Sequence, residues 1–238
     1  MRCCERIVIK VSIAQNLESI HNRIEHASEK RCVDNGDVKL IAVSKYHTIE
    51  EVKEAYGAGQ RVFGENRVQE LLPKIEAMSE YDGVEWHLIG HLQKNKVRQV
   101  VGKVALIQSV DSIGLLEEIE KRAAQQACHV DILLQVNVAN EEQKSGIQFE
   151  EIDAFVEVMP NMEHVFLKGL MFIAPNLENK NDLRPYFKKL NNKFHEIKNN
   201  ENDHVEMKWL SMGMSGDFEY AVSEGANMIR VGSAVFNS

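Results

Sequence analysis

Short apolar segments alternate with amphipathic helical patterns along almost the whole chain, and this alternation constrains the fold most strongly. Strands that alternate with helices imply parallel βαβ units. Eight segments have the length and apolar character of buried strands: residues 38–44, 61–64, 85–90, 104–110, 131–138, 165–171, 207–212 and 227–232. The pattern predicts an α/β fold, a single (β/α)8 barrel of the TIM type, and 238 residues are enough for one such domain.

The two ends of the chain suggest how the outer ring of helices is completed. Only six residues follow the last predicted strand, which leaves no room for an eighth helix there. An amphipathic helix precedes the first strand, with its apolar face formed by Ile13, Leu17, Ile20, Ile24 and Ala27. We expect this helix to fill the gap. The chain is therefore predicted to be one domain, 1–238, with an N-terminal extension and helix in 1–35 and the barrel core in 36–236.

Composition excludes several classes of protein. The formal net charge of −8 and the absence of a Lys/Arg tract argue against a general nucleic-acid binder. No apolar run approaches the length of a membrane span, and we recognise no signal peptide. The cysteines Cys3, Cys4, Cys32 and Cys128 form no C-x-x-C pair and no metal-binding spacing. We expect reduced thiols, a cytoplasmic location, no membrane partner, and a monomer or weak dimer.

Lys45 is the first candidate functional residue, because barrel enzymes carry their chemistry at the C-terminal ends of the strands. It directly follows the apolar segment 40–44. Burying an ammonium group is costly unless it is paired or neutralised, and a neutral lysine amine is the nucleophile that forms Schiff bases. Taken alone, the residue is more simply interpreted as a lysine that extends into solvent where the strand ends.

Two C-terminal segments contain the residue types of a phosphate site. Residues 211–217 follow the seventh strand and include Met214 and Ser215, and residues 230–233 close the eighth strand with Arg230, Gly232 and Ser233. The loops after strands seven and eight often bind phosphate in barrels, through free backbone N–H groups. The alternative is a tight glycine turn with Ser215 as a helix cap.

A third group lies at strands two and three. It contains Asn66, in the segment 64–66, and the histidines His87 and His91. Two histidines four residues apart suit a metal only on a helix, and Gly90 and the strand-to-loop setting remove that geometry. We therefore predict no metal site, with His87 as a hydrogen-bonded interior residue and His91 in a loop.

Seven sequence pieces, in order and near the ends of predicted strands, resemble those of the pyridoxal-phosphate homeostasis proteins, the YggS/PROSC family. The resemblance covers about residues 40–236. The pieces are residues 42–45, 64–70, 86–93, 144–146, 169–171, 210–215 and 229–236. Three positions depart from the family pattern. Tyr46 stands where the family usually has threonine, Ser233 where threonine is common, and Asn237 where a glycine usually follows the last phenylalanine.

The resemblance implies a barrel that binds pyridoxal 5′-phosphate (PLP), like the N-terminal domain of alanine racemases and eukaryotic ornithine decarboxylases. By this resemblance Lys45 holds PLP as a Schiff base and Arg230 faces the pyridine nitrogen. The cofactor-binding residues that it implies are Lys45, Asn66, His87, Met214, Ser215, Arg230, Gly232 and Ser233. Of these, Met214, Ser215, Gly232 and Ser233 would hold the phosphate, and Asn66 and His87 would line the pocket.

The expected function is vitamin B6 homeostasis without catalytic turnover, and no residue is assigned a catalytic role. PLP enzymes use the protonated pyridine ring as an electron sink, and an arginine cannot accept that proton. Related enzymes also carry a second domain that contributes catalytic residues, for which this sequence leaves no room. Three alternatives remain: a PLP-dependent racemase using His87, Tyr46 or Tyr56 as a second acid/base; a Schiff-base aldolase acting on a sugar phosphate; and a protein-interaction scaffold.

Overall fold

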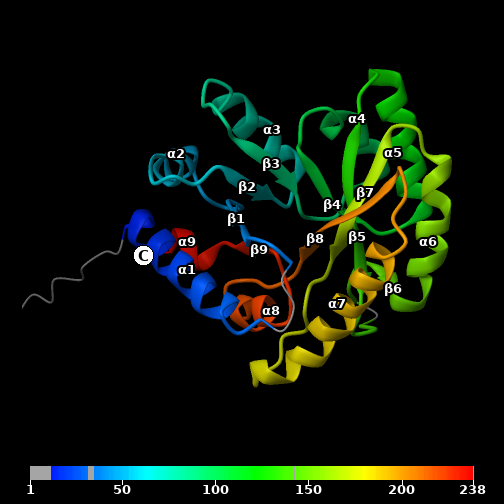
Figure 1. The fold of residues 1–238 in the computed structure, drawn as a ribbon. Helices are drawn as coiled ribbons and strands as arrows, with labels where there is room; N and C mark the ends of the chain where they lie inside the picture. The colour runs from blue at the N-terminus through cyan, green and yellow to red at the C-terminus, as the bar shows by residue number, and fades with distance from the viewer. Residues whose placement is uncertain (1–11, 32–34, 142, 238) are drawn as a thin grey trace, which may run out of the picture.

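The computed structural model describes residues 12–31, 35–141 and 143–237. In these ranges eight parallel strands close into a barrel, which confirms the predicted fold class (Figure 1). The barrel strands are β1 Lys39–Val43, β2 Val62–Glu65, β3 Glu85–Leu88, β4 Leu106–Val110, β5 Val130–Asn137, β7 Val165–Met171, β8 Val205–Ser211 and β9 Met228–Val231. Their order is β4-β3-β2-β1-β9-β8-β7-β5, and a β4–β5 pairing closes the ring. The two-residue strand β6, Ile147–Gln148, pairs with β5 beside the ring and was not predicted.

Helices surround the barrel. They are α1 Ile13–Ser28, α2 Ile49–Gly57, α3 Val68–Ala77, α4 Val97–Val100, α5 Ile113–Gln126, α6 Ile152–Val158, α7 Arg184–Lys198, α8 Phe218–Ser223 and α9 Ser233–Phe236. Short 3-10 helices occupy η1 Lys94–Lys96, η2 Phe149–Glu151, η3 Met159–Asn161 and η4 Lys180–Leu183. The expectation that no helix follows the last strand needs correction, because α9 forms there. It is a single turn, since few residues remain after Val231.

Helix α1 completes the outer ring, as predicted. A capping box starts it: the Gln15 N–H donates to Ser12 Oγ (3.3 Å), and the Ser12 N–H donates to Gln15 Oε1 (3.0 Å). All five residues of the predicted apolar face are buried. The helix packs against α2, α8 and α9, which lie around it in Figure 1. The N-terminal helix thus occupies the place in the outer ring beside the one-turn α9.

The apolar core has two parts. The larger part lies between the barrel and the helices, and the smaller part fills the barrel interior with Ile41, Leu106, Leu133, Met171 and Met228. Strand alternation produces this division, because successive side chains point inward and outward. Several inward positions are polar instead. Cys128 is a free thiol, and the other three cysteines lie outside the described residues.

Candidate functional site

A cavity of about 630 Å³ opens at the C-terminal ends of the barrel strands. Seven of the eight candidate residues lie in its wall: Lys45, Asn66, Met214, Ser215, Arg230, Gly232 and Ser233. They come from the segments after β1, β2, β8 and β9, and from β9 itself. The parallel strands end at one rim, so residues far apart in the sequence meet there.

Lys45 stands in the turn that follows β1, and two buried charges hold this turn. The Ser44 hydroxyl donates to Glu65 Oε1 (2.7 Å), and Lys74 Nζ donates to the Ser44 carbonyl (2.7 Å) and to Glu65 Oε1 (2.5 Å). Glu65 is fully buried. The next residue, Tyr46, has a positive φ of 68° and a side chain that is 77% exposed. Because Ser44 is anchored on both sides, the position of Lys45 at the rim is fixed.

The loops after β8 and β9 meet across the rim. The Ala234 N–H donates weakly to Ser215 Oγ (3.4 Å), which joins the two loops. Helix α8 begins at Phe218 with Asp217 as its N-cap, so Ser215 is not the helix cap. The Met214 N–H donates to Asp217 Oδ1 (2.5 Å). Among the described residues, the N–H groups of Ser215 and Gly216 have no hydrogen-bond acceptor. These groups and the two serine hydroxyls are suitable donors to an anion.

Arg230 contributes a fixed positive charge to the cavity wall. The residue is 4% exposed. Its Nη1 donates to Ser211 Oγ (2.5 Å) and its Nη2 donates to the Phe172 carbonyl (2.7 Å). Burial lowers the pKa of Arg230 to about 10, and the nearby Asp217 carboxylate opposes this effect. The guanidinium therefore stays charged at neutral pH.

Asn66 and His87 occupy different environments. Asn66 lies in the cavity wall, where its backbone approaches Gly90 so closely that a Cβ at Gly90 would overlap it. His87 is on β3, 2% exposed, and is not among the residues that line the cavity. Its Nδ1 is 2.9 Å from Gln108 Nε2 inside the barrel. Burial lowers the pKa of His87, so the ring is neutral at pH 7. The interior position predicted from the residue pattern matches this environment.

The cavity wall also contains residues to which the sequence analysis gave no role. Gln143, Lys144 and Ser145 come from the segment between β5 and β6, and Gln135 comes from β5. Lys144 Nζ donates to the Ala174 carbonyl (3.0 Å). The motif 144–146 was recognisable in the sequence, but its place at the rim depends on the unpredicted strand β6.

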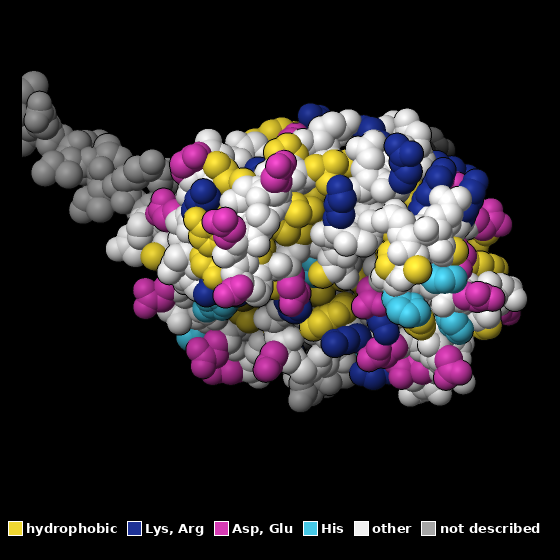
Figure 2. Space-filling view, turned by 90° about the horizontal axis from the view of Figure 1, so that it is seen from above, with side chains coloured by type: hydrophobic (Ala, Val, Ile, Leu, Met, Phe, Trp, Pro, Cys, Tyr) yellow, Lys and Arg dark blue, Asp and Glu magenta, His cyan; other side chains and the backbone are white. Residues whose placement is uncertain are grey.

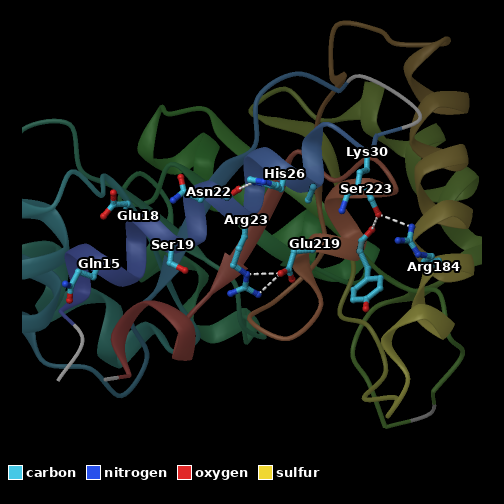
Figure 3. A pocket seen from close by; sticks show the side chains of 12 residues that line it. Gln15, Glu18, Ser19, Asn22, Arg23, His26, Lys30, Arg184, Glu219 and Ser223 are labelled. Carbon is cyan, nitrogen blue, oxygen red and sulfur yellow. Dashed lines mark hydrogen bonds and ion pairs between the residues drawn. The ribbon is translucent and has the colours of Figure 1, made fainter. Parts of the chain in front are cut away.

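A larger cavity, of about 780 Å³, lies outside the barrel between α1 and α8 (Figure 3). Polar side chains line it, and several are already paired. Arg23 Nη2 is 2.7 Å from Glu219 Oε1, and Arg184 Nη1 is 2.6 Å from Glu224 Oε1. Lys30, just after α1, also lines this groove, but the lining residues include no glycine, and all the others come from helices rather than from the ends of the barrel strands.

Three further observations limit the kinds of site present. Within residues 12–31, 35–141 and 143–237, no three His, Cys, Asp or Glu side chains are arranged to hold a metal ion. No helix in that part of the chain is both long and apolar enough to cross a membrane. Figure 2 shows acidic and basic side chains interspersed over one face of the molecule.

These features define a (β/α)8 barrel with a ligand site at the C-terminal ends of its strands. A lysine follows the first strand of this barrel, and glycine loops follow its last two strands. The profile of the family described as "Alanine racemase, N-terminal domain" matches residues 13–238. The pyridoxal phosphate homeostasis protein of Aquifex aeolicus is 42% identical over 236 residues, which cover 99% of this chain and 98% of that protein. The corresponding Helicobacter pylori protein is 40% identical, covering 84% and 87%. The chain belongs to the pyridoxal phosphate homeostasis protein family.

Solved structures agree with this assignment. PipY of Synechococcus elongatus, in a structure with PLP bound, has a TM-score of 0.82 and 34% identity, covering 95% of this chain and all of that one. An alanine racemase of Clostridium difficile has a TM-score of 0.66 at 14% identity, and this chain covers 56% of its length. The second likeness shows a shared fold alone.

Proposed function

We propose that this protein binds PLP as a Schiff base on Lys45 and acts in vitamin B6 homeostasis. One observation carries the proposal: a lysine amine, a permanent cation and two loops of hydrogen-bond donors line the same cavity at the strand ends. Each group matches one part of the cofactor, namely its aldehyde, its ring and its phosphate. A relative of 34% identity is described with PLP bound, which supports the assignment.

The phosphate is assigned to Met214, Ser215, Gly232 and Ser233, through backbone N–H groups and hydroxyls. Gly232 also lets this loop pack closely against β1, since a Cβ there would lie 3.1 Å from the Val43 carbonyl oxygen. Arg230 faces the pyridine nitrogen, and Asn66 forms part of the wall. Contact between His87 and the cofactor stays a prediction, and the interior position of His87 favours an indirect role.

The covalent step needs only Lys45. The Lys45 amine would hold the aldehyde carbon of the cofactor in a C=N bond, and the aldehyde oxygen would leave as water. The reverse step, addition of water or of another amine, releases the cofactor. Because this bond is reversible, the protein can act as a reservoir that stores PLP and releases it again. The cytoplasmic location and the monomeric or weakly dimeric state stay predictions.

We further propose that the protein has no substantial amino-acid turnover. When bound, PLP supplies an electron sink, which is strongest with a protonated ring nitrogen. Arg230 is itself a cation and disfavours that proton. Of the candidate acid/base residues, Tyr56 donates to the Asp82 carbonyl (3.0 Å) and His87 is buried inside the barrel. Of the three candidates Tyr46 alone is next to Lys45, and it is 77% exposed, so solvent rather than the cavity surrounds most of it.

The binding site is tested by borohydride trapping. The absorbance spectrum of PLP-loaded protein is recorded before and after reduction, and the modified lysine is mapped by peptide mass. We expect the label on Lys45 and its loss in Lys45→Ala. Lys144→Ala is the matched control, because Lys144 lines the same cavity. A label on another lysine, at full stoichiometry in the wild type, contradicts the assignment.

Turnover is tested by solvent deuterium exchange. PLP-loaded protein is incubated with amino acids in D₂O, and the Cα proton is followed by NMR. A positioned acid or base contributes about 10²–10⁴-fold to proton transfer. We expect exchange no faster than with free PLP. Protein-dependent exchange well above that rate, lost in Lys45→Ala, identifies a catalytic pocket and excludes the reservoir.

A further inference from the structure

A chain of hydrogen bonds crosses the barrel interior from Arg230 to His87, and a longer polar contact continues it to Glu85 at the opposite mouth. Arg230 Nη1 donates to Ser211 Oγ, and the Ser211 hydroxyl donates to Gln108 Oε1 (2.7 Å). Gln108 Nε2 lies 2.9 Å from His87 Nδ1, and His87 Nε2 lies 3.8 Å from Glu85 Oε2. The four residues from Arg230 to His87 are each less than 5% exposed. They replace apolar side chains in the interior of the barrel.

All the bonds of this chain have the same direction. An arginine side chain only donates, so Ser211 Oγ accepts from Arg230 and has its single hydrogen free for Gln108 Oε1. The Gln108 amide then presents its NH₂ group to His87, and Nδ1 of that ring must accept. At the far end an ionised Glu85 also only accepts. A cation at one end and a carboxylate at the other therefore orient every donor between them.

This direction determines which ring nitrogen of His87 carries the proton. Nδ1 accepts and is unprotonated, so the ring proton is on Nε2, which faces Glu85. His87, whose Nε2 lies 3.8 Å from Glu85 Oε2, and Lys39 together lower the pKa of Glu85 to about 2, so this carboxylate is ionised at neutral pH. Lys39 Nζ donates to the same Glu85 oxygen (2.9 Å). A glutamate with a 44% exposed side chain thus anchors the chain at the N-terminal mouth of the barrel.

We propose that Gln108 and His87 are positioning residues, which act through Ser211 to hold the Arg230 guanidinium in the orientation that faces the cofactor ring. This inference rests on the proposed assignment of Arg230 to the pyridine nitrogen. Hydrogen bonds in such a chain polarise one another, so the loss of one weakens the rest. Without His87, the Gln108 NH₂ group keeps only the weak acceptor Met228 Sδ (3.3 Å), and a flip of the amide would leave Ser211 without its acceptor. The guanidinium would keep only the Phe172 carbonyl as a fixed partner.

The alternative is that the chain only stabilises the barrel core. An apolar interior would serve that purpose at lower cost, since a partly satisfied buried network is worse than none. The two interpretations differ in what they predict for recognition of the ring nitrogen. A positioning role affects that recognition, whereas a packing role affects stability alone.

The test compares the affinity for PLP with that for N1-methyl-PLP, which cannot accept a hydrogen bond at the ring nitrogen. A hydrogen bond to a charged group is typically strong enough for wild-type protein to prefer PLP by at least about tenfold. We expect His87→Leu and Gln108→Leu to lose most of this preference. His87→Asn should retain it, because the asparagine oxygen replaces Nδ1 as an acceptor. Leu133→Val, in the same interior, is the control for core packing.

Each outcome is decisive. The proposal is wrong if the leucine variants prefer PLP as strongly as the wild type, or if Leu133→Val loses the preference equally. If the leucine variants fail to fold, ¹⁵N NMR of His87 in wild-type protein without PLP still tests the chain. A neutral ring protonated on Nε2 supports it, and protonation on Nδ1 contradicts it. Failure of wild-type protein to bind PLP contradicts the proposed function instead, and the NMR result remains valid.

Discussion

Replacing Ile20 with alanine tests whether α1 is part of the same folding unit as the barrel. We propose that residues 1–238 form one domain, with α1 as an integral part of its outer ring. Ile20 is 1% exposed and belongs to the main core cluster. Two polar contacts fix the helix beside it. Asn16 Nδ2 donates to the Val235 carbonyl (2.9 Å), and Arg23 pairs with Glu219.

The size of the effect follows from burial. An Ile→Ala change at a fully buried site removes apolar contacts and leaves a cavity, which costs about 2–5 kcal/mol. For a domain of this size each kcal/mol lowers Tm by about 2–4 °C. We therefore expect Ile20→Ala to lower the melting temperature by roughly 4–20 °C, in one transition that includes the whole chain.

The assay is a thermal melt followed by far-UV circular dichroism and by calorimetry, with Glu18→Ala as the matched control. Glu18 lies on the exposed face of the same helix, so its change should be within about 0.5 kcal/mol of wild type. Equal melting temperatures for the two variants would refute the reasoning. So would a separate early transition for α1 with the barrel transition unchanged, because α1 would then be an appendage.

Four further predictions follow from the described geometry. Pyridoxal should bind far more weakly than PLP, because backbone donors recognise the phosphate; equal dissociation constants contradict the phosphate site. Lys74→Met should cost about 3–5 kcal/mol in urea unfolding, since it leaves the buried Glu65 carboxylate unpaired; wild-type stability would show that the pair is unimportant. Gly169→Ala should cost at least about 2 kcal/mol, because φ is 145° and a Cβ would overlap the Trp209 carbonyl; an unchanged unfolding midpoint would contradict this. Burial lowers the pKa of His87, so below about pH 6.5 the unfolded chain binds a proton that the folded chain does not, and stability falls on acidification by up to about 1.4 kcal/mol per pH unit; His87→Asn should lack this component, and identical pH–stability curves would disprove it.

The barrel could be predicted from the sequence because its information is local. Each buried strand is a short apolar segment, and each helix shows a periodic face. The boundaries were less accurate. Strand β8 begins at Val205, two residues before the predicted segment, because the exposed Glu206 interrupts the apolar run by which the segment was recognised. Strand β6 has only two residues, and a pair of residues has no detectable period.

The sequence predicts a site residue where an unusual residue type directly follows a buried strand. Lys45 and the glycine loops satisfy that rule, and the structure places them in one cavity. The supporting residues do not satisfy it. Ser211 and Gln108 are 103 positions apart, and neither residue type is unusual in a strand. Their significance comes from inward orientation and mutual distance, which only the closed barrel establishes.

The charge of Arg230 connects retention of the cofactor with the proposed lack of turnover. A buried cation in the wall favours a dianionic ligand and, at the same time, disfavours a proton on the pyridine nitrogen. The first effect strengthens binding, and the second weakens the electron sink that amino-acid chemistry requires. A neutral residue at this position would lose the first effect, and a carboxylate would reverse both. The polarised chain to Glu85 keeps the charge in place without neutralising it, since Ser211 and Gln108 accept and donate but carry no charge. One charge at the strand ends thus supports retention of PLP and accounts for the proposed lack of turnover.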